Sequence, residues 1–337
     1  MKTTTQNKRI RSCCIIFIIL VLLAALYIYI SSSKRSNSPI TDTQFALNTV
    51  VTITLYDTQD TSILDGAFQL CRNYENIFSR TLESSELYQL NHSAKKTLTL
   101  SADLASLIST GLTYSSLSHG AFDISIAPVS QLWDFSAEEP AVPSSGDIAE
   151  NLPYVGYQNF TLKGTTLTRD NPHNAIDLGA IAKGYIADRI KDYLLSNNVN
   201  SAVINLGGNI LCVGSKQGKP FSIGVQAPFQ DHTKTIASLQ ITDRSIVTSG
   251  IYERYFIQDE KLYHHILNPK TGYSYDNDLI AVTILSDDSV TGDALSTTCF
   301  ALGYQEALAY LNTLENVDAI LITTDNQLHY TNHFPKE

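Results

Sequence analysis

Hydrophobic and polar positions repeat with two different periods along this chain, and together they predict both strands and helices. Residues 49–56 read TVVTITLY, in which every second side chain is apolar from residue 51 onward, and this alternation predicts a strand. Residues 64–78 read LDGAFQLCRNYENIF and carry apolar side chains at helical spacing, with Tyr74 and Phe78 on one face. The first part of the folded chain is therefore predicted to be a strand followed by a helix.

The second half contains further strands and helices around several glycines. Residues 175–195 begin with a short apolar run that predicts a strand ending at Asp177, and they continue as an amphipathic helix. Residues 201–214 predict two strands joined by a tight Gly-Gly-Asn turn, and residues 291–303 have the apolar spacing of another helix. Residues 137–149 are rich in Pro, Ser and acidic side chains, which predicts a surface loop.

The N-terminus has the pattern of a membrane anchor. Residues 13–30 are apolar and uncharged, and at about 1.5 Å per residue such a helix approaches the thickness of a bilayer's hydrocarbon core. We therefore expect a short basic tail over residues 1–12, a transmembrane signal anchor over 13–30, a polar linker over 31–42 and a folded domain over 43–337.

The charges around the apolar run predict its orientation. Four basic residues precede the run and two follow it, which by the positive-inside rule places the N-terminus in the cytoplasm and the folded domain outside the cell. The alternative is a cleaved signal peptide, whose apolar region usually spans only about 7–15 residues and ends at small side chains. This run is longer and ends at Tyr27, Ile28, Tyr29 and Ile30, so we favour an uncleaved single-pass anchor with an extracellular domain.

Composition narrows the class of protein. The chain has 337 residues, 43% hydrophobic and 17% charged, which is enough apolar material for a large core. Six of the 23 Lys and Arg residues precede the first acidic residue, so the rest of the chain carries 17 basic against 33 acidic groups, a net charge of −16. Such a domain is not expected to bind nucleic acid, which requires a basic surface. Five cysteines without a Cys-x-x-Cys pair exclude a disulfide scaffold and a dithiol redox motif.

Three groups of residues could carry chemistry. The first is the junction between Asp177 and Lys183, where small residues precede a helix N-terminus and could form a cradle for phosphate. The alternative is that its glycines only allow the backbone to turn. Neither GxGxxG nor GxxxxGK[ST] occurs, so the sequence does not support a common dinucleotide or nucleoside-triphosphate fold.

The second group is Asp293 and Thr297, which lie four residues apart and so share one face of a predicted helix. Carboxylate and hydroxyl oxygens are hard ligands that suit Mg²⁺. Asp293 could instead cap the start of its helix, and Thr297 could bond to a carbonyl one turn earlier.

The third group is the adjacent pair His264 and His265. Neighbouring residues on a strand face opposite ways, so at most one of the two is expected to enter a site.

Six motifs occur in order along the folded domain: HGAFDISIAP, DLGAIAKGY, NLGGNI, VTSGIYERYF, HHILNPKTGY and DALST. With these motifs the chain resembles the ApbE family of FAD:protein FMN transferases over roughly residues 43–322. The resemblance implies a single α+β domain of β-sheets flanked by helices. It also implies an enzyme that binds FAD, uses Mg²⁺ and passes FMN to a Thr or Ser hydroxyl of an acceptor flavoprotein, releasing AMP.

The resemblance also assigns roles to individual residues. It implies that His265 is the catalytic residue, and we expect it to act as the general base toward the acceptor hydroxyl because a histidine pKa lies near 6.5. The implied FAD-binding residues are Ala121, Phe122, Asp123, Asp177, Lys183 and Leu267. The implied Mg²⁺ ligands are the main-chain carbonyl of Ala180 and the side chains of Asp293 and Thr297, with Ser296 as a further contact.

Two positions depart from the family pattern, and two other functions remain open. Family members often have Met-Gly-Thr and a tyrosine where this chain has Leu47-Asn48-Thr49 and Thr81, which leaves those flavin contacts undetermined. The same site could act as a Mg²⁺-dependent FAD pyrophosphatase, with water replacing the acceptor. A non-catalytic FAD-binding surface protein is the third possibility, although it would need neither a base nor a metal. The implied partners are FAD, an acceptor flavoprotein outside the membrane and the membrane itself.

Overall fold

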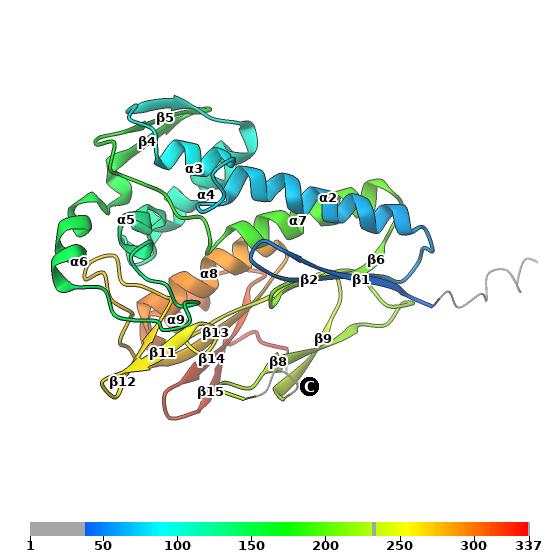
Figure 1. The fold of residues 1–337 in the computed structure, drawn as a ribbon. Coiled ribbons are helices and arrows are strands. Elements are labelled where there is room, and N and C mark those ends of the chain that lie inside the picture. Colours follow the sequence, from blue (N-terminus) through cyan, green and yellow to red (C-terminus); the bar gives the residue numbers. More distant parts are fainter. Residues whose placement is uncertain (1–37, 231–233, 336–337) are drawn as a thin grey trace, which may run out of the picture. The chain divides into compact units, whose positions relative to one another are not determined.

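The computed structural model describes residues 38–230 and 234–335, and the chain from Ile40 onward forms one compact unit. The tail, the anchor over residues 13–30 and most of the linker, as predicted from the sequence, lie outside the described residues. Within the described part, no helix is both long and apolar enough to cross a membrane. The α+β fold, with sheets flanked by helices, is confirmed (Figure 1).

An eight-stranded sheet forms the centre of this unit. All seven of its strand pairings are antiparallel, and several neighbours are far apart in sequence. In spatial order the strands are β1 (Ile40–Ala46), β2 (Thr49–Leu55), β6 (Ser201–Leu206), β7 (Asn209–Gly214), β10 (Ser245–Gly250), β13 (Leu279–Ser286), β14 (Asp318–Thr323) and β15 (Leu328–Tyr330).

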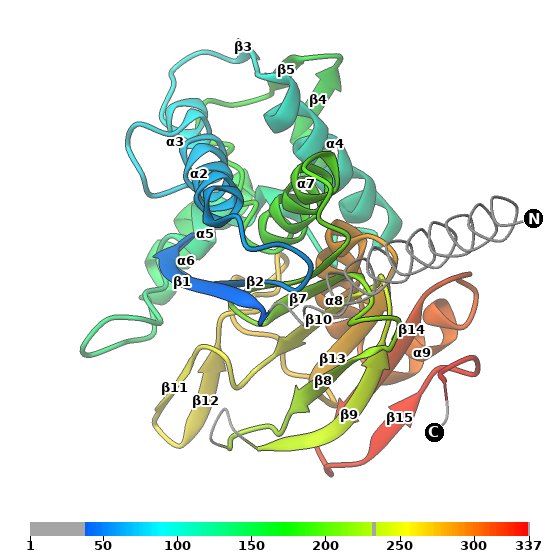
Figure 2. The same ribbon diagram turned by 90° about the vertical axis from the view of Figure 1, so that its right-hand side faces the viewer.

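Both faces of the sheet are covered, which explains why β13 is buried along its whole length. Ile284 packs on the helical side against α8 (Ser289–Leu302) and α9 (Tyr304–Leu311). The next residue, Leu285, faces the other way, toward a two-stranded sheet of β8 (Phe221–Gln226) and β9 (Thr235–Ile241). Figures 1 and 2 show the helices and this hairpin on opposite sides of the sheet.

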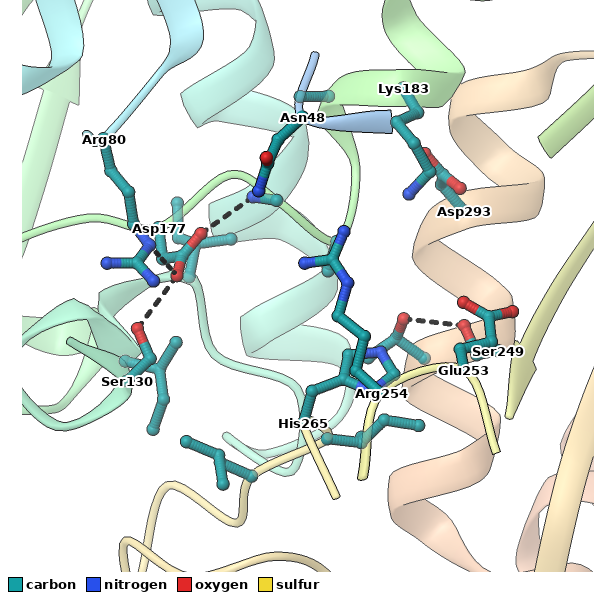
Figure 3. A pocket seen from close by; sticks show the side chains of 18 of the residues that line it. Asn48, Arg80, Ser130, Asp177, Lys183, Ser249, Glu253, Arg254, His265 and Asp293 are labelled. Carbon is teal, nitrogen blue, oxygen red and sulfur yellow. Dashed lines mark hydrogen bonds and ion pairs between the residues drawn. The ribbon is translucent and has the colours of Figure 1, made fainter. Parts of the chain in front are cut away.

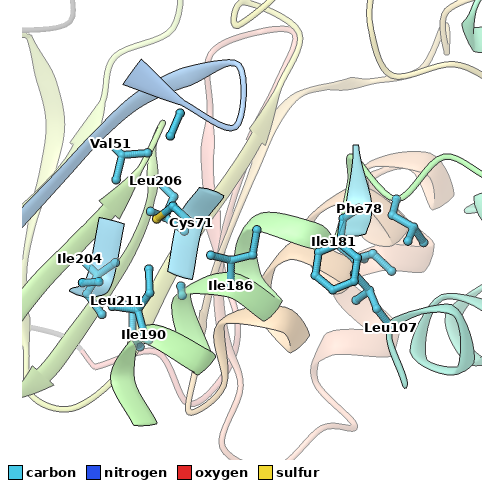
Figure 4. Packing of buried hydrophobic residues seen from close by; sticks show 14 of the residues in the cluster. Val51, Cys71, Phe78, Leu107, Ile181, Ile186, Ile190, Ile204, Leu206 and Leu211 are labelled. Atoms are coloured by element: carbon cyan, nitrogen blue, oxygen red, sulfur yellow. The ribbon is translucent and has the colours of Figure 1, made fainter. Parts of the chain in front are cut away.

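The largest core lies between the β1–β7 end of the sheet and three helices. These helices are α2 (Thr61–Phe78), α4 (Ala102–Leu117) and α7 (Ala182–Ser196). Figure 4 shows Ile186 and Ile190 of α7 among strand side chains such as Ile204 and Leu211. The apolar face predicted for α7 from its sequence is thus the face that packs on the sheet.

Smaller elements complete the described part. A three-stranded sheet and a separate two-stranded hairpin lie outside the central sheet. The remaining elements are α3 (Glu86–Asn91), β3 (Thr97–Thr99), η1 (Ile124–Ile126), α5 (Ala127–Ser130), α6 (Ser145–Asn151), η2 (Leu152–Tyr154), η3 (Tyr157–Asn159), β4 (Phe160–Lys163), β5 (Thr166–Arg169), β11 (Tyr255–Gln258) and β12 (Lys261–His264).

The three cysteines of the described part are free and buried. Each lies in a different hydrophobic cluster, and they are far apart in sequence: Cys71, Cys212 and Cys299. Burial raises the pKa of each thiol to about 12. These side chains therefore pack as small apolar groups.

Two predictions from the sequence were wrong in part. The apolar run before Asp177 is not a strand, because Asn91 bonds both the N–H and the C=O of Ile176 at 2.8 Å and so replaces a neighbouring strand. Residues 137–149 are not loop throughout: Ser144 accepts the N–H of Asp147 at 3.1 Å and thereby starts α6.

A buried arginine holds the segment that leads into the Asp177 region. Arg169 is 0% exposed, and its guanidinium donates to the carbonyl oxygens of Ser93, Lys95 and Asn174. No carboxylate pairs with it among the described ion pairs. Its role is to satisfy backbone acceptors where residues 93–95 meet residues 169–174.

We predict that Arg169→Met lowers the free energy of unfolding by about 3 kcal/mol, because buried carbonyls left without donors cost about 1–3 kcal/mol each and partly relax. Urea unfolding at neutral pH measures this loss. Arg72→Met is the control, because the Arg72 guanidinium bonds only the glutamines Gln44 and Gln69 near the surface. Equal losses in the two variants would contradict the assigned role.

Candidate active site

A cavity of about 640 Å³ lies where the first turn of α7, the side of α8 and the loop after β10 come together. That volume is within the range of about 300–1,000 Å³ typical of small-molecule sites. Ten of the eleven residues to which the resemblance assigned a role line it, all except Ser296: Ala121, Phe122, Asp123, Asp177, Ala180, Lys183, His265, Leu267, Asp293 and Thr297. Figure 3 shows the labelled members of this set converging from different elements.

Asp293 is the most completely enclosed charged group of the cavity, with 3% of its surface exposed. One carboxylate oxygen accepts the N–H of Gly184 at 2.6 Å, and the other accepts Nδ2 of Asn209 at 3.0 Å. Burial raises the pKa of Asp293, while the nearby Lys183 ammonium and these two hydrogen bonds lower it. The sequence left open whether Asp293 caps its own helix. It instead bonds the first turn of another helix, α7.

Hydroxyl groups stand beside Asp293 on the same side of α8. Thr297 Oγ1 lies 3.1 Å from Ser249 Oγ, which in turn lies 2.8 Å from Ser296 Oγ. Ser296, rather than Thr297, bonds back to the carbonyl of Asp293, at 3.0 Å. The Thr297 hydroxyl therefore faces the cavity-lining Ser249 and not the helix backbone.

The available donors fit Mg²⁺. Asp293 keeps further lone pairs beyond its two hydrogen bonds, and the Thr297 hydroxyl and the Ala180 carbonyl add hard oxygens. In the described ranges 38–230 and 234–335, no three His, Cys, Asp or Glu side chains form a metal-binding cluster. A metal bound here would thus depend on hydroxyl and carbonyl oxygens beside a single carboxylate.

Two cations and a second acid line the cavity near this oxygen cluster. Lys183 lies in the first turn of α7, and Arg254 follows β10 in the same loop as Glu253 (Figure 3). Glu253 is exposed, and the charges of Lys183 and Arg254 lie close enough to act on it. The positive side chains and the helix N-terminus favour an anionic ligand at this point.

Asp177 occupies another part of the cavity and is held in place by three groups. Its Oδ2 accepts Ser130 Oγ at 2.9 Å and pairs with Arg80 Nε at 3.0 Å, and its Oδ1 accepts the N–H of Gly179 at 2.9 Å. Figure 3 shows Asn48 pointing toward the same carboxylate. Asp177 therefore links the end of α2, the α5 region and the approach to α7.

The structure separates the two adjacent histidines. His264 is 4% exposed, its Nε2 lies 2.8 Å from the carbonyl of Tyr275, and its ring packs against Phe300. His265 lines the cavity, and its Nδ1 is a buried polar atom without a hydrogen-bond partner in the described structure. Of the pair, His265 is the one available to a ligand.

The environment of His265 differs from what the sequence suggested. Burial first, and then the charge of Arg254, lowers the pKa of His265 to about 3, with smaller effects from His264 and Lys183. This pKa is below the reference value of about 6.5 for a histidine in an unfolded chain. The imidazole is neutral at physiological pH and can accept a proton, but it is a weaker base than expected.

The residues assigned to FAD binding differ in how free they are. Both carboxylate oxygens of Asp123 accept backbone N–H groups, from Ser125 at 2.8 Å and Tyr157 at 2.9 Å, so this side chain shapes the wall. The carbonyl of Ala121 accepts the Tyr275 hydroxyl at 2.7 Å. Phe122 and Leu267 are 4% and 9% exposed and form apolar wall.

The positions that depart from the family pattern also reach the cavity. Leu47 and Asn48 form the turn between β1 and β2, with φ of 54° and 55°. Asparagine tolerates this left-handed backbone, whereas leucine is strained there. Gly207 is required opposite them, because its φ is 61° and a Cβ would lie 2.1 Å from Thr49 Oγ1. The strain at Leu47 is consistent with a turn held in place by its neighbours.

Sequence reasoning missed several polar residues of the site. Arg80, Asn209, Ser249, Glu253 and Arg254 all line the cavity, but none was assigned a role. Four of them lie inside or beside the motifs NLGGNI and VTSGIYERYF, so the motifs contained the signal. Arg80 stands in a stretch that departs from the family pattern and carried no such signal.

Comparisons with known proteins agree with this geometry. A protein from Klebsiella pneumoniae named FAD:protein FMN transferase is 39% identical over 80% of this chain and 84% of its own length. A protein of the same name from Treponema pallidum is 32% identical, covering 79% and 78%. The crystal structure of an ApbE protein from Thermotoga maritima is 30% identical and covers 88% of this chain and 98% of its own, with a TM-score of 0.80.

The fold and the cavity define an α+β protein in which basic side chains lie beside a cluster of carboxylate, hydroxyl and carbonyl oxygens. The family model described as "ApbE family" matches residues 47–321 of the chain. The chain belongs to the ApbE family.

The two histidines predict how stability depends on pH. Their pKa values in the folded protein are about 4 for His264 and about 3 for His265, against about 6.5 when unfolded. Between pH 6.5 and 4 the unfolded state binds more protons, so stability falls as pH falls, by at most about 1.4 kcal/mol per pH unit for each histidine.

Urea unfolding of wild type and His265→Asn at several pH values tests this expectation. We expect the wild type to lose stability relative to the variant as pH falls from 6.5 to 4. Only in the wild type does unfolding allow the His265 imidazole to bind a proton that it does not bind in the folded state. Above pH 7 the difference should be constant. A difference that does not change from pH 7 to 4 would show that the His265 pKa is near its ordinary value.

Proposed function

We propose that the protein transfers FMN from FAD to a Thr or Ser hydroxyl of an acceptor flavoprotein and releases AMP. The observation that carries the proposal is the convergence of Asp293, Thr297, Lys183 and His265 on one cavity. The names of the Klebsiella and Treponema relatives support the same reaction. A site that only stored FAD would need neither the enclosed carboxylate nor the neighbouring imidazole.

Mg²⁺ fits this function as well as this donor set. Asp293, Thr297 and the carbonyl of Ala180 would hold the ion. When bound, it would supply Lewis-acid neutralisation of charge on the pyrophosphate oxygens. The protein's own cations act on the same charge, since Lys183 and Arg254 line the cavity beside the oxygen cluster.

The reaction forms one bond and breaks one. The acceptor oxygen bonds to the phosphorus of the FMN half, and the bond from that phosphorus to the oxygen shared with AMP breaks, so AMP leaves with the bonding pair. The hydroxyl proton passes to the imidazole of His265. Burial lowers the His265 pKa most, and the charges of Arg254 and Lys183 lower it further; the negative pyrophosphate of FAD would offset the part that is due to charge.

Mass spectrometry of an acceptor protein tests the proposal. A candidate extracellular flavoprotein is incubated with this protein, FAD and Mg²⁺, and a covalent FMN mass on a Thr or Ser is the expected result. Free FMN and AMP without a modified acceptor would instead identify a pyrophosphatase. No turnover of FAD under any Mg²⁺ concentration would leave only the binding function.

We predict that His265→Ala lowers the rate of FMN transfer by about 10² to 10⁴-fold, the usual contribution of a general base, with FAD affinity little changed. His264→Ala is the matched control. It should lower stability, because it removes the contact with the Tyr275 carbonyl, but it should cost far less in rate per folded molecule. Similar rate losses in both variants would show that the histidines act only on structure.

We also propose that the folded domain is extracellular, held by the apolar run over residues 13–30. The uncharged run and the excess of basic residues before it support this topology. Protease added to intact cells should remove the domain. If the domain is digested only after lysis, it lies inside the cell and the topology is wrong.

A further inference from the structure

Two helices of the site, α7 and α8, begin without a side-chain cap of their own. Neither Ile181, which precedes α7, nor Asp288, which precedes α8, makes a side-chain cap hydrogen bond. Each helix start leaves backbone N–H groups that need acceptors. Here the acceptors come from the other helix of the pair.

The two helices cap each other. Asp293 on α8 accepts the N–H of Gly184 in the first turn of α7 at 2.6 Å. Asp188 on α7 accepts the N–H groups of Ser289 and Val290, the first two residues of α8, at 2.8 and 2.9 Å. Gly184 and Asp188 are four residues apart on one helix, as are Ser289 and Asp293 on the other, so each pair shares a face. We call these four residues the reciprocal cap.

A chain of side-chain hydrogen bonds joins the two halves of the reciprocal cap. Ser289 Oγ donates to Oδ1 of Asn209 at 2.7 Å, and Nδ2 of Asn209 donates to Asp293 at 3.0 Å. Ser289 Oγ also accepts a hydrogen bond from the Ser245 hydroxyl at 2.9 Å. These side chains are at most 3% exposed. Asp188 thus fixes Ser289, Ser289 fixes the Asn209 amide, and the amide orients the Asp293 carboxylate.

The contact between the helices leaves no room for adjustment. A Cβ on Gly184 would lie 2.3 Å from the carbonyl oxygen of Ser289, so the two backbones touch at the reciprocal cap. A small shift of the α8 start is therefore transmitted directly to Gly184 and to Asp293. Asp188 itself does not line the cavity.

We propose that Asp188 is a positioning residue for the site: by capping α8 from outside the cavity, it sets the position of the Asp293 carboxylate. This inference rests on the proposed function for the role of Asp293 toward Mg²⁺. Its geometric part, the placement of Asp293 against Gly184, stands independently of that function.

The test compares Asp188→Ala with Asp188→Asn and with a control at an ordinary cap. Asp60→Ala is that control, because Asp60 caps α2 locally by accepting the N–H of Ser62 at 2.9 Å and lies outside the cavity. The first measurement is amide hydrogen exchange of the Gly184 region by mass spectrometry. The second is the Mg²⁺ concentration for half-saturation, from calorimetric titration of MgCl₂ into each protein holding FAD. Thermal unfolding of each variant serves as the common reference.

We expect Asp188→Ala to speed exchange at Gly184 and to raise the half-saturating Mg²⁺ about 10-fold, the lower end of the effect of losing a residue that orients a ligand. Asp188→Asn should change the Gly184 exchange rate and the half-saturating Mg²⁺ concentration less than Asp188→Ala, since its amide oxygen still accepts one N–H. Asp60→Ala should lower the unfolding temperature without either change. If Asp188→Ala lowers the unfolding temperature but leaves Gly184 exchange and Mg²⁺ binding as in wild type, the proposal is wrong.

Failure of the proposed function would look different. If Mg²⁺ binds neither wild type nor any variant, the metal role of Asp293 is lost, whereas faster exchange at Gly184 in Asp188→Ala would still support the positioning by Asp188. Unchanged exchange together with normal Mg²⁺ binding in wild type would reject the positioning alone.

Discussion

The site depends on how closely α7 and α8 approach each other. The backbone contact at Gly184 brings the start of α7, with Lys183, against the side of α8, with Asp293 and Thr297. The two helix backbones that carry these groups are in contact, so packing fixes the helices relative to each other. The central sheet supports the α7–α8 pair, since α8 packs on β10 and β13. Strand β10 also supplies Ser249.

The cavity, like the chain as a whole, has more acidic than basic side chains. Arg80, Lys183 and Arg254 line the cavity together with six Asp and Glu residues, and Arg80 pairs with one of these, Asp177. Charges within a few ångströms inside a partly dry cavity outweigh distant surface charges, which water and salt screen. The net charge therefore predicts the absence of nucleic-acid binding but says little about the ligand of the site.

The sequence predicted those parts of the site that depend on local spacing. The amphipathic face of α7 and the shared face of Asp293 and Thr297 follow from helical periodicity, and the six motifs indicated the family and its fold. What it could not predict were contacts between distant segments. The bond between Asp293 and Gly184 joins residues 109 apart, and only the folded chain shows that Asp293 caps a different helix.

The same limit explains the error at Ile176 and the lowered pKa of His265. An apolar run becomes a strand only if a neighbouring strand accepts its hydrogen bonds, and here the side chain of Asn91 does so instead. A histidine pKa depends on burial and on nearby charge, and the pairing of β11 with β12 places Arg254 beside His265. Neither effect leaves a short-range pattern in the sequence.

The buried thiols have a consequence for where such a domain can work. With a pKa of about 12, Cys71, Cys212 and Cys299 hold almost no thiolate at neutral pH, and the thiolate is the form that reacts with oxidants and disulfides. Their burial also keeps reagents away from the sulfur atoms. The stability of the described fold therefore requires neither a disulfide nor a reducing environment, and the domain can keep the same covalent structure on either side of a membrane.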